Sequence, residues 1–389
     1  MAEADYMDLE HTGPGTLAGR YLRTFWQPVF RSKDLRPGRV SPIQILGEKL
    51  TLFRGEGGEP HLVGFRCAHR GSQLSVGWVE GDAIHCRYHG WAYDGSGRCV
   101  EQPGEEDEAF RDRVGIQSYP CQEYLGLIFA YLGEGSPPPL RRFVDFERPG
   151  VLEAGVPEIW PCNYFNRIDN DSAHVPFTHR ESTLRTSGRL PSGARDSTGQ
   201  ETEYGVMSTS LQPGRPQFYV HFHMPNTNQT RSVVRVEGSI EDARNLYVDR
   251  LFWRLPIDDD NCISYVVDLV PLTGEAGEAY RERRRQSEEA EGPSPNELAA
   301  AILRGELRVE DVDPSISMYK LFWIEDYMTQ VGQGSMAERP PEHLARSDQT
   351  VILKRKVWQR ELKALSEGRP LKQWTEPPGL ADMNATTAG

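Results

Sequence analysis

Four residues in the first quarter of the chain are of types that bind metals through sulfur and nitrogen. They form two short groups, Cys67-Ala-His69 and Cys86-Arg-Tyr-His89, with sixteen residues between His69 and Cys86. Each group offers one thiolate and one imidazole. A [2Fe–2S] cluster with two Cys ligands on one iron and two His ligands on the other needs this set of donors. The order suits two loops that each give one ligand to each iron.

Two other uses of these four residues have to be weighed. Two Cys and two His also suit a tetrahedral structural zinc, but zinc sites usually pair their ligands as C-x2-4-C and H-x3-5-H. The alternating order here does not fit those spacings. A disulfide between Cys67 and Cys86 would leave both His unexplained. The two-iron cluster is therefore the favoured interpretation, and zinc remains the alternative.

A second group of metal-binding residue types lies some eighty residues further on. The segment 163–179 carries two carboxylates, Asp169 and Asp171, and two imidazoles, His174 and His179. Two His and one carboxylate are the donors of the facial triad of non-haem Fe(II) oxygenases. The two His are five residues apart, about 140° off on a regular helix. Pro176 between them predicts a distorted backbone that brings both to one metal. The other interpretation is a pair of hydrogen-bonded core histidines.

The two groups, in this order, resemble the large (oxygenase) subunit of Rieske non-haem iron oxygenases. The resemblance runs from about residue 14 to about residue 360 and is closest to the phthalate-dioxygenase-like and vanillate-demethylase-like branch. The motifs that carry it are Gly-Pro-Gly-Thr-Leu at 13–17, Phe25-Trp-Gln-Pro28, Leu46-Gly-Glu48, Cys67-Ala-His-Arg-Gly71 and Tyr88-His-Gly-Trp91.

The resemblance implies two metal sites. A Rieske [2Fe–2S] cluster is expected on Cys67, His69, Cys86 and His89. A mononuclear Fe(II) is expected on His174, His179 and a carboxylate far along the chain. The segment from Trp323 to Gly334 is similar to the family's context for that carboxylate. Asp326 is therefore the expected third ligand, and the adjacent Glu325 is the alternative.

The resemblance also implies a catalytic aspartate. In the family this residue joins a mononuclear-site His to a Rieske His of the neighbouring subunit. Asp171, three residues before His174, is expected to take this role, with Asp169 as the alternative. Position 167, often Asn in the family, is Arg here.

The activity implied by the resemblance is that of a terminal oxygenase. Electrons come from NAD(P)H through a separate reductase, in some members through a ferredoxin, and O2 is used to hydroxylate or O-demethylate an aromatic substrate. Two alternatives are a non-aromatic substrate, by N-demethylation or steroid-type hydroxylation, and a pure electron-transfer protein. The resemblance further implies a homotrimer, in which one chain's cluster lies near the next chain's iron.

Two sets of residues bear on the substrate. Arg167 and Arg180 flank the expected iron ligands and could hold a substrate carboxylate, or form structural ion pairs. Five aromatic residues could form a cage for a cationic substrate, or ordinary core. They are Trp160, Phe165, Phe177, Phe252 and Trp253.

Composition limits the partners and the location. The net charge of −13 argues against nucleic acid as a partner. The longest apolar run, residues 125–132, is far shorter than the ~20 residues of a membrane span. The acidic N-terminus lacks an apolar signal region, so a cytoplasmic protein without a membrane partner is expected. The four cysteines outside the two groups are expected to be reduced thiols.

The pattern of elements predicts an α+β protein with a Rieske β-domain and a catalytic domain. The expected parts are a helical arm at 1–40, the Rieske domain at 41–135, the catalytic domain at 136–376 and a polar tail at 377–389. Short alternating runs predict strands at 43–46, 49–53, 61–65, 83–86, 91–94, 99–102 and 125–132, then at 218–223, 232–237, 245–255 and 262–272. Helices are predicted at 17–26, 315–333 and 348–365, and the charged run 275–291 as a solvated helix or loop. The resemblance implies a curved antiparallel sheet with covering helices, a helix-grip, START-like fold.

Overall fold

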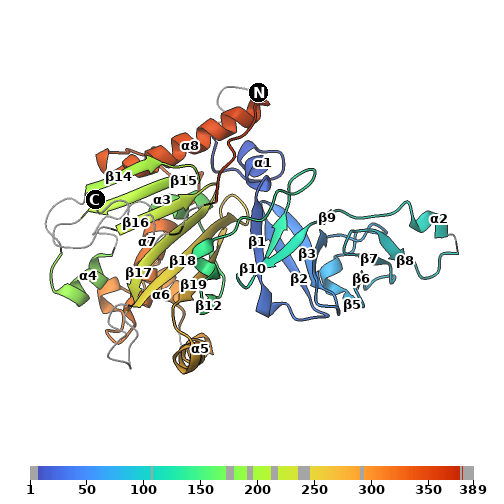
Figure 1. Cartoon of the computed structure of the whole chain (residues 1–389), viewed down its shortest axis with the longest axis horizontal. Helices are drawn as coiled ribbons and strands as arrows, with labels where there is room; N and C mark the ends of the chain where they lie inside the picture. The colour runs from blue at the N-terminus through green and yellow to red at the C-terminus, as the bar shows by residue number, and fades with distance from the viewer. Residues whose placement is uncertain are drawn as a thin grey trace.

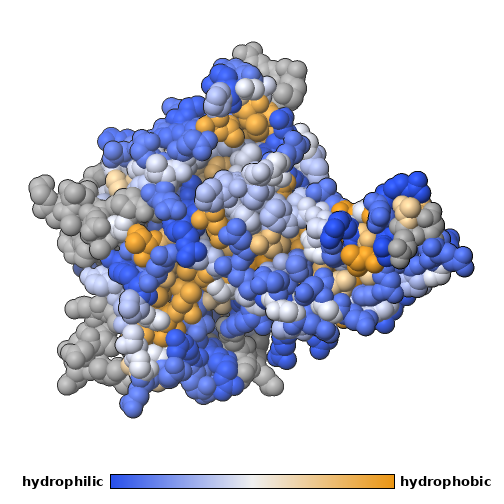
Figure 2. All heavy atoms as spheres, turned by 45° about the vertical axis from the view of Figure 1, so that its right-hand side comes forward, coloured by the Kyte–Doolittle hydropathy of each residue, from blue (hydrophilic) through white to orange (hydrophobic). Residues whose placement is uncertain are grey.

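The structure is a computed structural model that describes residues 8–106, 108–171, 179–190, 196–211, 218–234, 246–289, 293–376 and 379. Figure 1 shows an elongated molecule with a smaller, β-rich N-terminal part at one end and a larger part of helices and sheet at the other. In the face drawn in Figure 2, polar residues dominate and apolar patches are interspersed among them.

The N-terminal arm contains a helix and then a strand. Helix α1 (Leu17–Arg23) begins after Thr16, whose side chain accepts a hydrogen bond from the Gly19 N–H. The helix is three residues shorter than predicted, because Trp26 already begins strand β1 (Trp26–Arg31). Strand β1 pairs with β11 (Leu127–Tyr131), which also pairs with β10 (Cys121–Tyr124). The second half of the arm is therefore part of a three-stranded sheet.

Two four-stranded antiparallel sheets form the rest of the N-terminal part. One sheet has the order β2 (Val40–Ile45), β3 (Glu48–Arg54), β4 (Pro60–Gly64) and β9 (Ser118–Tyr119), and the other has β5 (Trp78–Glu80), β6 (Ala83–His85), β7 (Ala92–Asp94) and β8 (Cys99–Glu101). The predicted strands of this region are confirmed. Phe53, Ile84 and Tyr93 form a small core that also includes Cys67 and Cys86. This core holds the two ligand loops together.

The larger part is built on an eight-stranded antiparallel sheet. Its strands are β12 (Val151–Ala154), β13 (Glu158–Trp160), β14 (Asp196–Glu201), β15 (Gly205–Leu211), β16 (Phe218–His223), β17 (Thr227–Val234), β18 (Leu246–Pro256) and β19 (Cys262–Val270). The strands predicted at 218–223, 245–255 and 262–272 are confirmed as β16, β18 and β19. The strand predicted at 232–237 overlaps only the end of β17, and residues 235–237 lie outside the described residues. The other four were missed; edge strand β14, for example, has the polar sequence DSTGQE and no apolar alternation.

Because side chains alternate along a strand, the two faces of this sheet meet different neighbours. On β18, Arg254 faces helix α3 (Tyr164–Asn170) and donates a hydrogen bond to Asp171, the residue that follows this helix. Trp253 points the other way, and its ring centroid lies 5.6 Å from that of Phe129 on β11. One face therefore packs against helices, and the other against the N-terminal part.

The remaining helices surround the sheet (Figure 1). They are α4 (Arg180–Ser187), α5 (Gly274–Glu289), α6 (Pro295–Leu303), α7 (Met318–Val331) and α8 (Gln349–Ser366), with α2 (Glu108–Arg111) in the N-terminal part. The predicted helices α7 and α8 are confirmed, and the charged run 275–291 is mostly helix α5. The buried Lys354 of α8 donates from Nζ to the Ile168 carbonyl at 2.8 Å, which fastens α8 to the end of α3.

The fold class predicted from the sequence is confirmed. The division of the chain at residue 135 remains a prediction, as does the polar tail, which lies almost entirely outside the described residues. Among the helices in the described ranges, none combines the length and apolar character needed to cross a bilayer.

Candidate metal centres

The two predicted cluster loops have matching backbone turns. Gly71 N–H donates to the Cys67 carbonyl at 2.9 Å, and Gly90 N–H donates to the Cys86 carbonyl at 3.0 Å. Both glycines have positive φ values, 73° and 76°, which favour glycine over residues with a Cβ. Each loop therefore turns tightly behind its cysteine.

The sulfur and nitrogen ligands lie at different depths. Cys67 and Cys86 are 3% and 2% exposed, whereas His69 and His89 are exposed. The two imidazole rings lie side by side, with centroids 4.7 Å apart. Within the described ranges no three His, Cys, Asp or Glu side chains are arranged to hold one metal ion. Buried thiols beside exposed imidazoles fit a two-iron cluster better than a single zinc.

Tyr93 lies against the buried sulfur. Its hydroxyl oxygen accepts from the Ala68 N–H at 3.1 Å and lies 3.2 Å from Cys67 Sγ, to which it can donate. Burial raises the pKa of the Cys67 thiol, and the Tyr93 hydrogen bond only partly opposes it. A thiolate here therefore needs the positive charge of bound iron, and Tyr93 would stabilise that thiolate.

The second predicted site is partly described. His179 precedes α4 as its N-cap residue, and its Nε2 lies 3.0 Å from Oδ1 of Asp326 on α7, although 147 positions separate them. Asn170, at the end of α3, donates to the same Asp326 oxygen at 3.2 Å. His179 and Asp326 are 27% and 28% exposed, so both can reach a ligand. His174 and Pro176 lie outside the described residues, as does the predicted backbone distortion.

The two adjacent acids of α7 have different surroundings. Successive residues point about 100° apart on a helix. Asp326 faces the His179 imidazole, whereas the Glu325 carboxylate is buried and accepts hydrogen bonds from Glu181 and Ser182 at the start of α4. Asp326 is thus the acid that lies beside a predicted iron ligand.

The predicted catalytic carboxylate, Asp171, follows α3 and is held by the sheet. Arg254 donates to both of its oxygens at 2.9 Å, and Asn228 Nδ2 donates to Oδ2 at 2.7 Å. Burial alone would raise the pKa of Asp171, but the Arg254 guanidinium holds it below its ordinary value. Oδ1 accepts only the Arg254 bond among those described, which leaves it room for another donor.

Asp169, the alternative, points elsewhere. Its Oδ2 accepts from Arg355 on α8, from Nε at 3.1 Å, and burial raises the pKa of Asp169 to about 6. This carboxylate ties α3 to α8.

The residues considered for substrate binding are mostly structural. The Arg167 guanidinium is buried 3.4 Å from the centroid of the Trp160 ring and donates to Gln330 at 3.3 Å. Phe165 and Trp253 are also buried in the main core. These residues form neither a carboxylate site nor an open aromatic cage. Arg180 is exposed at the first turn of α4, and Phe177 lies outside the described residues.

Three residues near the predicted sites had no role in the sequence analysis: Tyr93, Arg254 and Phe322. The Phe322 ring packs edge-on against His179, with centroids 4.9 Å apart. Of these three residues, Arg254 could have been recognised from the sequence. Arg254 interrupts the apolar run Leu-Phe-Trp-Arg-Leu of β18, and a charge in such a strand indicates a buried ionic partner.

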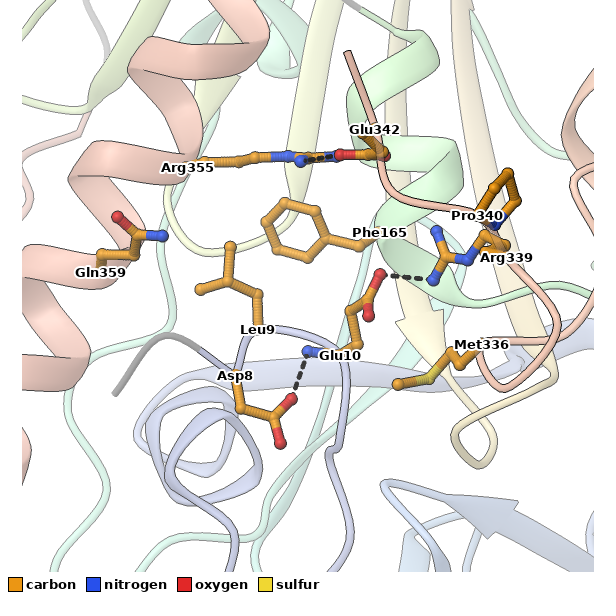
Figure 3. Close-up of a pocket in the computed structure, with 10 residues that line it drawn as sticks. All are labelled: Asp8, Leu9, Glu10, Phe165, Met336, Arg339, Pro340, Glu342, Arg355 and Gln359. Carbon is orange, nitrogen blue, oxygen red and sulfur yellow. Dashed lines mark hydrogen bonds and ion pairs between the residues drawn. The ribbon is translucent and has the colours of Figure 1, made fainter. Parts of the chain in front are cut away.

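A separate cavity of about 330 Å³ lies between the N-terminal segment, α3 and α8 (Figure 3). Four of its charged side chains form two ion pairs: Arg339 pairs with Glu10, and Arg355 pairs with Glu342. The first of these pairs fastens the N-terminal segment to the larger part of the chain.

Comparisons with known proteins agree with this geometry. The family model described as Rieske [2Fe-2S] domain matches residues 25–120. The 5,5'-dehydrodivanillate O-demethylase oxygenase subunit of a Sphingobium species is 25% identical over 98% of this chain and 85% of its own length. The phenoxybenzoate dioxygenase subunit alpha of Ectopseudomonas oleovorans is 43% identical, over 44% of this chain and 46% of its own length.

Solved structures share the fold. NdmA of Pseudomonas putida CBB5 has a TM-score of 0.62 at 19% identity, covering 89% of this chain and 92% of NdmA. The oxygenase–ferredoxin complex of carbazole 1,9a-dioxygenase gives a TM-score of 0.59 at 20% identity, covering 92% of this chain and 93% of the matched one.

The N-terminal part is thus a Rieske [2Fe–2S] domain, and its two loops carry the Cys and His residues predicted as cluster ligands. The relatives extend this assignment beyond that domain. Together these matches support the large (oxygenase) subunit of a Rieske non-haem iron oxygenase, an enzyme with a Rieske cluster and a mononuclear iron.

Proposed function

We propose that this oxygenase hydroxylates or O-demethylates an aromatic substrate at an Fe(II) held by His174, His179 and Asp326. The observation that carries the proposal is the 3.0 Å approach of His179 Nε2 to Asp326 Oδ1. Two neutral imidazoles bind Fe(II) more weakly than two imidazoles with a carboxylate, and the triad leaves positions open for other ligands. When bound, the cluster supplies single electrons and the Fe(II) supplies the site of O2 activation.

Each of this chain's residues has a distinct part in the proposal. Cys67 and Cys86 hold one iron of the cluster from inside the domain, and His69 and His89 hold the other at its surface. Asp171, kept ionised by Arg254, accepts a hydrogen bond from a cluster imidazole of the next subunit and so links the two metal sites.

An aromatic substrate is supported by the side chains beside His179 and by the names of relatives. On α7, Phe322 and Tyr319 are 39% and 50% exposed and lie within two turns of Asp326. Exposed rings at this place can stack on a flat substrate. The relatives include an O-demethylase of dehydrodivanillate, a phenoxybenzoate dioxygenase and a 3-chlorobenzoate-3,4-dioxygenase. They also support the phthalate-dioxygenase-like and vanillate-demethylase-like branch.

The alternative is oxidation of another class of substrate. It is favoured by the structure of NdmA with caffeine and by a 4beta-methylsterol monooxygenase relative. Trp160, Phe165 and Trp253 are buried in the main core, so these three rings do not offer an open face to a cationic amine. Phe252, of the same predicted set, is half-buried.

The proposed redox partners are a reductase that takes electrons from NAD(P)H and, between it and the oxygenase, a ferredoxin. The carbazole 1,9a-dioxygenase oxygenase was solved in complex with its ferredoxin. A cytoplasmic location is proposed with them, because all six cysteines are unpaired, as expected in a reducing compartment.

The active assembly is proposed to be a homotrimer. A head-to-tail contact that closes makes a ring, and a ring brings the exposed His89 of one chain towards Asp171 of the next. We expect light scattering of the purified oxygenase to give three times the chain mass. Full activity in a sample that is monomeric at the assay concentration would contradict the ring.

The proposed activity is tested by O2 uptake. The purified oxygenase, supplied with a reductase and NADH, is screened against aromatic acids and aryl methyl ethers, with a methylxanthine and a sterol as comparison substrates. Hydroxylated or demethylated aromatic products are expected. Turnover confined to the two comparison substrates would favour the alternative.

A further inference from the structure

The start of helix α4 has an unusual cap. N-cap residues commonly use their side chain to accept from the first free N–H groups of the helix. The N-cap residue here is His179, whose side chain makes no such bond because its Nε2 lies against Asp326. A side chain that binds a metal cannot also cap its own helix, so the N–H groups of α4 need another acceptor.

Glu325 of α7 is that acceptor. Its Oε1 accepts from the Glu181 N–H at 2.6 Å, and its Oε2 accepts from the Ser182 N–H at 3.3 Å and the Ser182 hydroxyl at 2.5 Å. Glu325 is 2% exposed. A carboxylate buried with three donors at a helix N-terminus is well satisfied and favours that end of the helix dipole.

We propose that Glu325 is a positioning residue for the mononuclear iron site, an inference that rests on the proposed function. Glu325 and Asp326 are adjacent, and they act on the same neighbour in two ways. Glu325 fixes the backbone at the start of α4, and Asp326 contacts the imidazole that this backbone carries. Together they set the separation between His179 and Asp326, two of the three proposed ligands.

This role explains why Glu325, whose carboxylate does not face His179, is buried next to Asp326, whose carboxylate does. Without the Glu325 carboxylate, the Glu181 and Ser182 N–H groups lose their acceptor, and the first turn of α4 has to move to find others. The Ser182 hydroxyl can still donate to the His179 carbonyl, at 3.2 Å. His179 would move with that turn. Residues that orient metal ligands in this way typically contribute about 10- to 100-fold to metal affinity.

The test measures Fe(II) affinity rather than activity alone. Wild type, Glu325→Gln and Glu325→Ala are stripped of mononuclear iron and equilibrated by dialysis against Fe(II) without oxygen, and the iron bound beyond the cluster is counted. We expect Glu325→Gln to weaken this binding by about 10- to 100-fold, with an unchanged Rieske spectrum. Turnover should return at saturating Fe(II), because the ligands themselves remain.

A matched control is available on helix α6. Glu297 accepts from the Ser294 N–H at 2.6 Å in the capping box of α6, so Glu297→Gln removes the charge of a helix-capping glutamate that is exposed and does not cap α4. It should leave Fe(II) affinity unchanged. If Glu325→Ala loses the Rieske spectrum through misfolding, Glu325→Gln and Ser182→Ala decide the question.

The possible outcomes separate clearly. Wild-type Fe(II) affinity in Glu325→Gln and Ser182→Ala would overturn the positioning role. Loss of the third iron at every Fe(II) concentration in Glu325→Gln, with retention in Asp326→Asn, would make Glu325 a ligand and also overturn it. A wild-type chain that binds no third iron would instead reject the mononuclear site, and this inference with it.

Discussion

Replacing Asp326 by Ala is expected to remove the mononuclear iron and with it all oxygenation, while the Rieske cluster and its colour remain. Asp326 is the acid beside His179, and the variant leaves only imidazoles to bind Fe(II). The pair is partly exposed, so its loss should cost less than about 1 kcal/mol of folding free energy. Iron analysis, the Rieske electron-spin signal and thermal unfolding measure these three effects.

The contrast with the adjacent acid sharpens this prediction. Saturating Fe(II) should not restore turnover in Asp326→Ala, whereas it should in Glu325→Gln. Three irons per chain in Asp326→Ala would reject Asp326 as a ligand, and Glu325 would be the next residue to test.

Replacing Asp171 by Asn is expected to leave both metal sites loaded yet nearly abolish turnover. A neutral amide cannot form the charge-assisted bond proposed to link the neighbouring subunit's imidazole to the mononuclear site. The change also weakens the buried pair with Arg254, at a cost of about 1.5–3 kcal/mol. Single-turnover kinetics should show that the reduced cluster no longer delivers its electron, although iron content is normal.

A matched control separates the electron route from simple destabilisation. Asp268 on β19 accepts two hydrogen bonds, at 2.5 and 2.7 Å, from Arg250 on β18, the strand that also carries Arg254. Asp268→Asn should therefore lose similar stability but keep electron delivery. Normal single-turnover rates in Asp171→Asn would show that another residue carries the route.

The prediction of the cluster site uses residues that lie close together in the sequence. The ligands lie within 23 residues, each loop closes on its own glycine, and short strands with turn residues between them mark the surrounding sheets. The choice of Asp326 depended on one resemblance, since the sequence does not show that α7 lies against the start of α4. That contact comes from the tertiary packing of segments 147 positions apart.

Other parts could not be predicted for physical reasons. Strand β14 lies at the edge of the sheet and its sequence, DSTGQE, has no apolar residue, so no periodicity marks it. The partners of Asp171 and the role of Glu325 depend on which buried donors face each carboxylate. From the sequence one can predict that a charged residue will need a partner if it is buried. The identity of that partner depends on the tertiary structure.

The central claim, that one chain carries both a Rieske cluster and a mononuclear iron, is tested most directly by counting metal and sulfide in the purified protein. The account predicts three irons and two acid-labile sulfides per chain, with a Rieske electron-spin signal in the reduced protein. Two irons with two sulfides would contradict the mononuclear site. A colourless protein with stoichiometric zinc and no sulfide would contradict the cluster on Cys67, His69, Cys86 and His89.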